Sequence, residues 1–181
     1  FGYTNCPDIC TPDMQNLMLG LKSFEKSAPE LAAKIVPIFI TVDPKRDTPA
    51  VLKQFVSAFH PRAIGLTGTD AEIADAAKKF AVYFSRTEGS APDAYLMSHS
   101  QTPYLMGPDG KPLAILPADQ PKTDTNEGAP DLVLADLANQ PQAGPDHHRQ
   151  GHPHDPPLGL DADLVGLDLP QGTRVLHQMF R

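Results

Sequence analysis

Apolar residues recur at helical spacing in three stretches of the chain and predict three amphipathic helices. The first follows Thr11 as the expected N-cap and Pro12 as the first helical residue. Thr48 and Pro49 open the second helix, and Asp70 is expected to cap the third. The apolar positions are Met14, Leu17, Met18, Leu21 and Phe24, then Val51, Leu52, Phe55, Val56 and Phe59, and finally Ile73, Ala74, Ala77 and Phe80.

Runs of apolar residues without helical spacing predict the strands. Residues 35–42 (IVPIFITV) form a continuous apolar run, which suits a strand in the middle of a sheet. Shorter strand-like runs occupy residues 81–86, 93–97, 104–106 and 111–116, and the last two are joined by the turn signal GPDG at 107–110. The pattern predicts a mixed α/β sheet flanked by helices.

The character of the chain changes after about residue 120. Proline, glycine, aspartate and asparagine become frequent, and one amphipathic stretch at 130–138 suits a short closing helix. We therefore divide the chain into a folded domain at 1–120, a variable segment at 121–139 and a disordered tail at 140–181. The tail holds a tract with His147, His148, His152 and His154. Such tracts bind divalent metals weakly, but a low-complexity end without a metal role explains the tract as well.

Whole-chain properties exclude some classes of partner. The 181 residues carry a formal net charge of −7 and no basic cluster, which argues against nucleic acid as a partner. The sequence has no run of about 18 apolar residues, so it predicts no membrane span within these residues. A 40% share of hydrophobic residues is enough for one folded core.

The only two cysteines, Cys6 and Cys10, stand just before the first predicted helix. If their turn is helical, the i and i+4 spacing places both sulfurs on one side, where they can share a metal ion or form a disulfide. The positive end of the helix favours thiolate over thiol. Two inert buried cysteines, or a structural disulfide, remain the alternative.

A copper site that accepts both oxidation states needs a nitrogen donor beside two thiolates. Ahead of the tail the sequence offers only His60 and His99. His60 precedes Pro61 and is interpreted as a capping or surface residue. His99 lies in an expected loop between two strand-like runs, and such a loop can carry its side chain to the cysteine turn. The methionines that could serve as soft ligands are interpreted as core residues instead: Met14, Met18, Met97 and Met106.

Residues 43–48 (DPKRDT) form a charged loop at the end of the predicted central strand, the edge of an α/β sheet at which sites collect. Two interpretations stay open for this loop. It can be a solvated turn with a helix cap, or it can contribute to docking of a partner.

Four segments resemble the Sco/SenC family in order and spacing: residues 1–10 (FGYTNCPDIC), 41–52 (TVDPKRDTPAVL), 59–68 (FHPRAIGLTG) and 99–110 (HSQTPYLMGPDG). These are membrane-tethered, thioredoxin-like proteins that bind copper and help to assemble the binuclear copper centre of cytochrome c oxidase. The resemblance covers about residues 1–120 and implies that Cys6, Cys10 and His99 bind a copper ion. Asn5, Thr11 and Ser98 depart from common family residues, and the lack of a carboxylate at Ser98 is expected to loosen the site slightly.

Family members carry an anchoring helix, a hairpin and most of a buried strand upstream of the cysteine turn. We therefore expect this chain to be truncated at its start and unstable by itself, with its membrane anchor in the missing segment. The resemblance implies the periplasmic face of the bacterial inner membrane. It also implies, as partner, a copper-accepting oxidase subunit or another copper chaperone.

Two functions are compatible with these residues. The first is a non-enzymatic copper metallochaperone. The second is a thiol:disulfide oxidoreductase in which Cys6 and Cys10 reduce the cysteines of the copper acceptor. The CxxxC spacing is wider than the usual CxxC, and Gln101 stands where many thioredoxin-like reductases have a cis-proline, so both features favour the chaperone. The two activities can coexist, because they use the same sulfurs. A peroxidase is less favoured.

Overall fold

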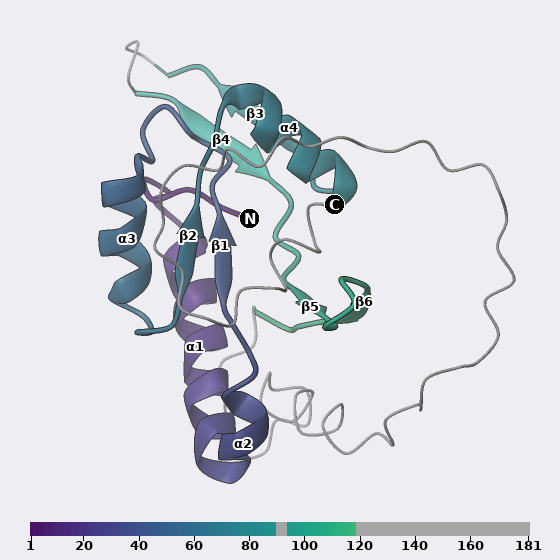
Figure 1. Cartoon of the computed structure of the whole chain (residues 1–181). Helices are drawn as coiled ribbons and strands as arrows, with labels where there is room; N and C mark the ends of the chain where they lie inside the picture. Colours follow the sequence, from purple (N-terminus) through teal and green to yellow (C-terminus); the bar gives the residue numbers. More distant parts are fainter. Residues whose placement is uncertain (90–93, 119–181) are drawn as a thin grey trace, which may run out of the picture.

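The computed structural model describes residues 1–89 and 94–118. The expected variable segment at 121–139, the expected tail at 140–181 and its histidine tract lie outside these residues. Figure 1 shows helices on either side of a central pair of strands, with two strand hairpins beside them. Within the described residues, none of the helices is both long and apolar enough to cross a lipid bilayer.

The three predicted helices are present, together with one short helical turn. They are α1 (Cys10–Ser27), α2 (Pro29–Ala32), α3 (Pro49–Ser57) and α4 (Asp70–Lys79). Thr48 caps α3 as predicted, because its side chain accepts a hydrogen bond from the Val51 N–H and Pro49 follows it. The predicted cap of α4 is one residue off: Thr69 is the cap and forms a reciprocal capping box with Glu72.

The start of α1 also differs from the prediction. The helix begins at Cys10, not after Thr11, and its N-cap Ile9 makes no side-chain capping bond. The reason is that the preceding turn already runs in helical conformation, since the Asp13 N–H donates to the Ile9 carbonyl. Cys10 therefore belongs to the first turn of α1, and its side chain takes its direction from the helix.

Within residues 1–89 and 94–118, the strands pair as three two-stranded units, whereas the sequence predicted a single mixed sheet. β1 (Ile38–Ile40) pairs in parallel with β2 (Ile64–Leu66). On its other side the chain of β1 continues into a parallel bridge between Thr41 and Gly2, so the apolar run at 35–42 is central, as predicted. The remaining strands form two antiparallel pairs, β3 (Phe84–Thr87) with β4 (Leu96–His99) and β5 (Tyr104–Met106) with β6 (Pro112–Ile115).

The core between α1, α3 and β1 is built from buried side chains of all three elements, namely Met14, Phe39, Leu52 and Val56. β2 comes close to α3 because Gly65 has no side chain; a Cβ there would lie 2.8 Å from the Leu52 Cβ. This packing holds the end of α1 that carries Cys10 against the central strands. Figure 1 shows α1 crossing beside the β1–β2 pair, with α3 on the outer side of β2.

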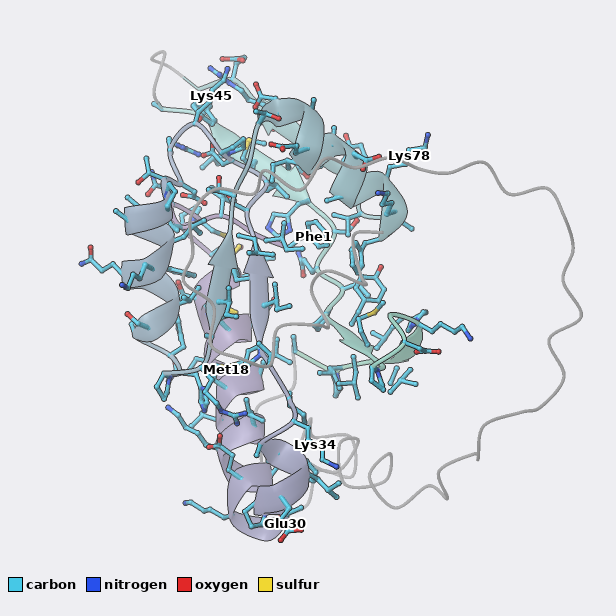
Figure 2. All side chains as sticks on the ribbon, viewed as in Figure 1. Phe1, Met18, Glu30, Lys34, Lys45 and Lys78 are labelled. Carbon is cyan, nitrogen blue, oxygen red and sulfur yellow. The ribbon has the colours of Figure 1, made fainter. Side chains whose placement is uncertain are left out.

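The methionines lie largely where the pattern predicted. Met14 and Met18 are buried on α1, and Met97 packs against the cluster that contains Cys10. Met106 is only half-buried. Phe1 packs against the same cluster as Met97, near the middle of the view in Figure 2, and its ring contacts Phe80 with centroids 5.5 Å apart.

Candidate metal centre

The cysteine turn directly follows the extended segment at Gly2, which forms a parallel bridge with Thr41 just after β1. The Gly2 N–H donates to the Ile40 carbonyl, and the Gly2 carbonyl accepts from the Val42 N–H. Two residues later the chain turns, and the Cys6 N–H donates to the Tyr3 carbonyl at 3.3 Å. Cys6 thus sits in the turn itself, half-buried, whereas Cys10 is buried at the first residue of α1.

His99 reaches this turn from a strand, not from the loop that the sequence suggested. It is the last residue of β4, directly opposite Phe84 of β3, and both side chains face the buried cluster of Tyr3, Cys10 and Val42. The reason is that the β3–β4 pairing extends to His99 and continues at the next pair, where the Ser100 N–H donates to the Tyr83 carbonyl and the Tyr83 N–H donates to the Ser100 hydroxyl. A strand end holds the imidazole in one direction more firmly than a loop.

The central contact of the site joins Cys10 and His99. The Cys10 Sγ lies 3.3 Å from the His99 Nε2, and the His99 Nδ1 lies 2.8 Å from the Ser100 carbonyl oxygen. A carbonyl oxygen can only accept, so Nδ1 carries the proton and Nε2 keeps its lone pair. That lone pair points at the sulfur, which is the tautomer a metal ligand needs.

The pKa values of the two thiols are shifted in opposite directions. Burial and the hydrogen bond with Cys6 raise the pKa of Cys10 to about 12. Burial also raises the pKa of Cys6, but hydrogen bonds from Cys10 and from the backbone N–H groups of Asp8, Cys10 and Ile9 outweigh it, so the pKa of Cys6 lies below its ordinary value. The pair therefore favours a Cys6 thiolate beside a Cys10 thiol.

The surroundings of the pair keep His99 neutral. Burial lowers the pKa of His99 from its ordinary value, against a smaller opposing effect of the Ser100 backbone. The Tyr3 ring meets the imidazole edge to face, with centroids 6.0 Å apart, and Val42, Phe84 and Met97 complete an apolar wall. At neutral pH the site thus offers one unprotonated nitrogen and one acidic thiol.

The structure brings the three predicted ligands into one neighbourhood but not into a closed shell. Cys10 and His99 are in contact, and Cys6 packs against the same cluster. Across residues 1–89 and 94–118, no three side chains of histidine, cysteine, aspartate or glutamate already form a metal-holding group. The donor set itself suits copper, because thiolates serve copper(I) and imidazole serves copper(II).

His60, the other candidate histidine, is far from this site, and the expectation that it caps a helix or lies on the surface is wrong. It is only 2% exposed. Its Nδ1 accepts the Arg62 N–H at 3.2 Å, and its Nε2 lies 3.3 Å from the Glu25 carboxylate. Pro61 does end the segment, but the turn folds His60 inward against α1, where polar partners satisfy both nitrogens.

The charged loop at 43–48 is the feature whose role the sequence left most open. The interpretation as a solvated turn is wrong for its two carboxylates, because Asp43 is 3% exposed and Asp47 is completely buried. Asp43 pairs with Arg46 and accepts a hydrogen bond from the Tyr95 hydroxyl at 2.7 Å. The Arg46 guanidinium also lies 3.8 Å from the centroid of the Tyr95 ring. The loop is thus tied to the segment that leads into β4 and His99.

Comparison with known proteins decides the family. A sequence model of the SCO1/SenC family matches residues 1–132, a range that includes Cys6, Cys10 and His99. The chain belongs to the SCO1/SenC family. Its mixed α/β architecture is the thioredoxin-like fold of Sco proteins, as the solved relatives also show.

Among curated Sco relatives, the mitochondrial protein SCO1 of Saccharomyces cerevisiae is 46% identical over 112 residues, which are 61% of this chain and 37% of the yeast protein. The SCO2-like protein of Rickettsia conorii is 41% identical over 112 residues, covering 61% of this chain and 53% of that protein. The chain therefore spans about half or less of the length of these relatives.

Solved Sco structures superpose on most of the chain. ScoI of Bradyrhizobium japonicum with copper bound is 36% identical and gives a TM-score of 0.63, covering 76% of this chain and 80% of its own. Yeast Sco1 with copper bound is 38% identical and gives a TM-score of 0.66, covering 79% of this chain and 76% of its own. Copper is present in both of those relatives.

Proposed function

We propose that this protein is a copper metallochaperone that carries one copper ion on Cys6, Cys10 and His99 and delivers it for assembly of the cytochrome c oxidase copper centre. The observation that carries the proposal is the 3.3 Å contact between the Cys10 sulfur and the lone-pair nitrogen of His99. Membership of the SCO1/SenC family supports it, as do the copper-bound relatives.

The arrangement of the three ligands suits a copper ion that must first be bound and then released. Cys10 and His99 sit on α1 and β4, which are fixed by the core, whereas Cys6 sits on a turn and is only half-buried. An incoming pair of thiolates from an acceptor can replace Cys6 first, and Cys10 and His99 afterwards. Copper then passes from one ligand set to the other without becoming free.

The acceptor and the location follow from the family resemblance. We infer that the partner is a copper-accepting oxidase subunit or another copper chaperone, and that exchange takes place at the periplasmic face of a bacterial inner membrane. The yeast and mouse relatives are mitochondrial proteins, and another relative comes from Rickettsia conorii.

A second function, thiol:disulfide oxidoreductase, is favoured by the asymmetry of the thiols. The lowered pKa of the half-buried Cys6 and the raised pKa of the buried Cys10 are typical of a nucleophilic and a resolving cysteine. In this reaction Cys6 attacks a disulfide of the acceptor and Cys10 resolves the mixed disulfide. The acceptor gains two thiols while Cys6 and Cys10 become a disulfide.

Copper titration of the reduced chain tests the first function. We expect one tightly bound copper(II) per chain with a thiolate-to-copper charge-transfer band in the visible spectrum. Cys6→Ala, Cys10→Ala and His99→Ala should each abolish this stoichiometric binding, since each removes one of three donors. His60→Ala is the matched histidine control and should keep it. Loss of copper in His60→Ala with retention in His99→Ala would refute the ligand assignment.

A peptide that carries a two-cysteine disulfide, like that of an oxidised copper acceptor, tests the second function. An oxidoreductase would reduce the peptide in the absence of copper and accumulate a Cys6–Cys10 disulfide, measurable by mass spectrometry. The Cys10→Ala variant should then trap a mixed disulfide through Cys6. If the wild-type chain leaves the peptide oxidised while it binds copper, the chaperone function stands alone.

A further inference from the structure

Asp47 is a completely buried carboxylate that holds the chain just ahead of Cys6. Its Oδ2 accepts the Thr4 N–H at 3.0 Å and the Thr41 hydroxyl at 2.6 Å, and its Oδ1 accepts the Thr4 hydroxyl at 2.5 Å. Thr4 and Asp47 lie 43 positions apart in the sequence. The same carboxylate therefore binds Thr4 through both its backbone N–H and its hydroxyl. We call these hydrogen bonds between Thr4 and Asp47 the Asp47 clasp.

The position of this clasp explains where the strand ends. Gly2 forms both bonds of a parallel ladder with the chain of β1, using the Ile40 carbonyl and the Val42 N–H. If the ladder continued, the Thr4 N–H would donate to the Val42 carbonyl. It donates to Asp47 instead. The carboxylate thus replaces the next step of the ladder and directs the chain away from β1 at Thr4.

The turn that carries Cys6 starts at this point. Tyr3, next to the clasped residue, accepts the Cys6 N–H through its carbonyl. The Tyr3 ring lies against His99. The position of Cys6 relative to the Cys10–His99 pair is therefore set by a short segment, residues 3–6, whose anchor is Asp47.

Only a carboxylate satisfies all three donors. Asparagine at position 47 would offer one oxygen and one N–H₂ group, so at least one of the donors on Thr4 and Thr41 would lose its partner in a buried site. The neighbouring Asp43 does not share this task, because it is paired with Arg46 and Tyr95.

We propose that Asp47, acting through Thr4, is a positioning residue that holds the Cys6 turn in reach of Cys10 and His99 for copper binding. This proposal rests on the copper site proposed above. Asp47 itself touches no copper ligand in the described residues; its effect passes through the backbone of residues 4–6. The charged loop at 43–48 thereby gains a role in the metal centre.

The test uses the full chain and three threonine variants. Thr4→Val removes the hydroxyl of the clasp, Thr4→Ser retains a hydroxyl, and Thr41→Val removes the third donor of Asp47 without touching Thr4. Copper(II) affinity and the charge-transfer band are measured for each. Without metal, hydrogen exchange of the peptide covering residues 1–10 is measured by mass spectrometry, together with the midpoint of thermal unfolding.

We expect Thr4→Val to weaken copper binding roughly tenfold and to reduce the charge-transfer band. Exchange at residues 4–6 should accelerate roughly fivefold or more. Thr4→Ser should restore both readouts. Thr41→Val should lower the unfolding midpoint at least as much as Thr4→Val, because Thr41 is fully buried, but leave copper affinity and exchange at residues 4–6 near wild type.

Equal loss of copper affinity in Thr4→Val and Thr41→Val would overturn the proposal, because a general loss of stability would then explain both. Unchanged affinity in Thr4→Val would overturn it as well. If the wild-type chain binds no copper, the proposed function fails. In that case the exchange measurement still decides whether the Asp47 clasp holds the cysteine turn.

Discussion

The Cys10 sulfur lies 3.3 Å from the His99 Nε2, although 89 positions separate the two residues in the sequence. The contact depends on two rigid elements, the first turn of α1 and the last residue of β4. Cys6, by contrast, is carried by the turn that precedes α1. The site therefore combines a sulfur–nitrogen pair that is already in contact with one half-buried thiol on a turn.

His60 and His99, the two histidines of residues 1–89 and 94–118, should differ in what they contribute. His60→Ala leaves the Glu25 carboxylate and the Arg62 N–H without their buried partner, so we expect a loss of about 1–3 kcal/mol in the free energy of unfolding. His99→Ala should cost less stability, because its Nε2 is only partnered by a thiol. Urea denaturation of both variants without metal checks this. A larger loss in His99→Ala would contradict it.

Alkylation should distinguish the two thiols. Because the pKa of Cys6 is lowered and that of Cys10 is raised to about 12, iodoacetamide should modify Cys6 first at neutral pH. The rate at Cys6 should rise with pH and level off above its pKa. Peptide mass spectrometry of partly alkylated protein identifies the modified residue, and preferential modification of Cys10 would refute the assignment.

Cys10→Ala should shift this pH profile upward. The Cys10 thiol donates a hydrogen bond that favours the Cys6 thiolate, so its removal raises the pKa of Cys6 and slows alkylation at neutral pH. The rate at high pH should not fall, because the thiolate is then fully formed in both proteins. Cys6 in the His99→Ala variant serves as the comparison, since it keeps the Cys10 thiol.

Local patterns predicted the helices well because each helix buries one face. Thr48 predicts the start of α3 because its hydroxyl can cap a helix, and Pro49 because its fixed φ suits the first helical position. The apolar spacing of α1 is recognisable without tertiary information. The residues alone made His99 a candidate that a loop could carry to the cysteine turn, and the family resemblance implied that it joins Cys10, since neither local sequence encodes a partner so distant.

Other features depend on tertiary contacts that sequence patterns do not contain. Pro61, which ends a helix, predicts that His60 is a capping or surface residue, but in the fold Glu25 and the Arg62 backbone satisfy it in the interior. The charges of residues 43–48 predict a solvated turn, but Asp47 is completely buried. Its three donors come from Thr4 and Thr41, on segments that meet only in the fold.

Two glycines provide a matched pair of substitutions. In Gly2→Ala the new Cβ would lie 2.9 Å from the Phe39 ring and 3.3 Å from the Cys10 sulfur, whereas in Gly65→Ala it would lie 2.8 Å from the Leu52 Cβ. Each should cost about 1–3 kcal/mol of stability through overpacking. Only Gly2→Ala should also weaken copper binding, because it displaces Cys10. Equal copper affinity in both variants would show that the sulfur tolerates the shift.

The histidine tract should act separately from the proposed copper site. His147, His148, His152 and His154 lie close together in a proline-rich and glycine-rich segment, a composition that binds divalent ions weakly and with little selectivity. Deletion of residues 140–181 should therefore remove weak zinc or nickel uptake and leave the single tight copper site unchanged, and replacement of the four histidines by glutamine in the full chain should do the same. Titration calorimetry measures both. A weaker tight site in either variant would mean that the tract takes part in holding or loading the copper on Cys6, Cys10 and His99.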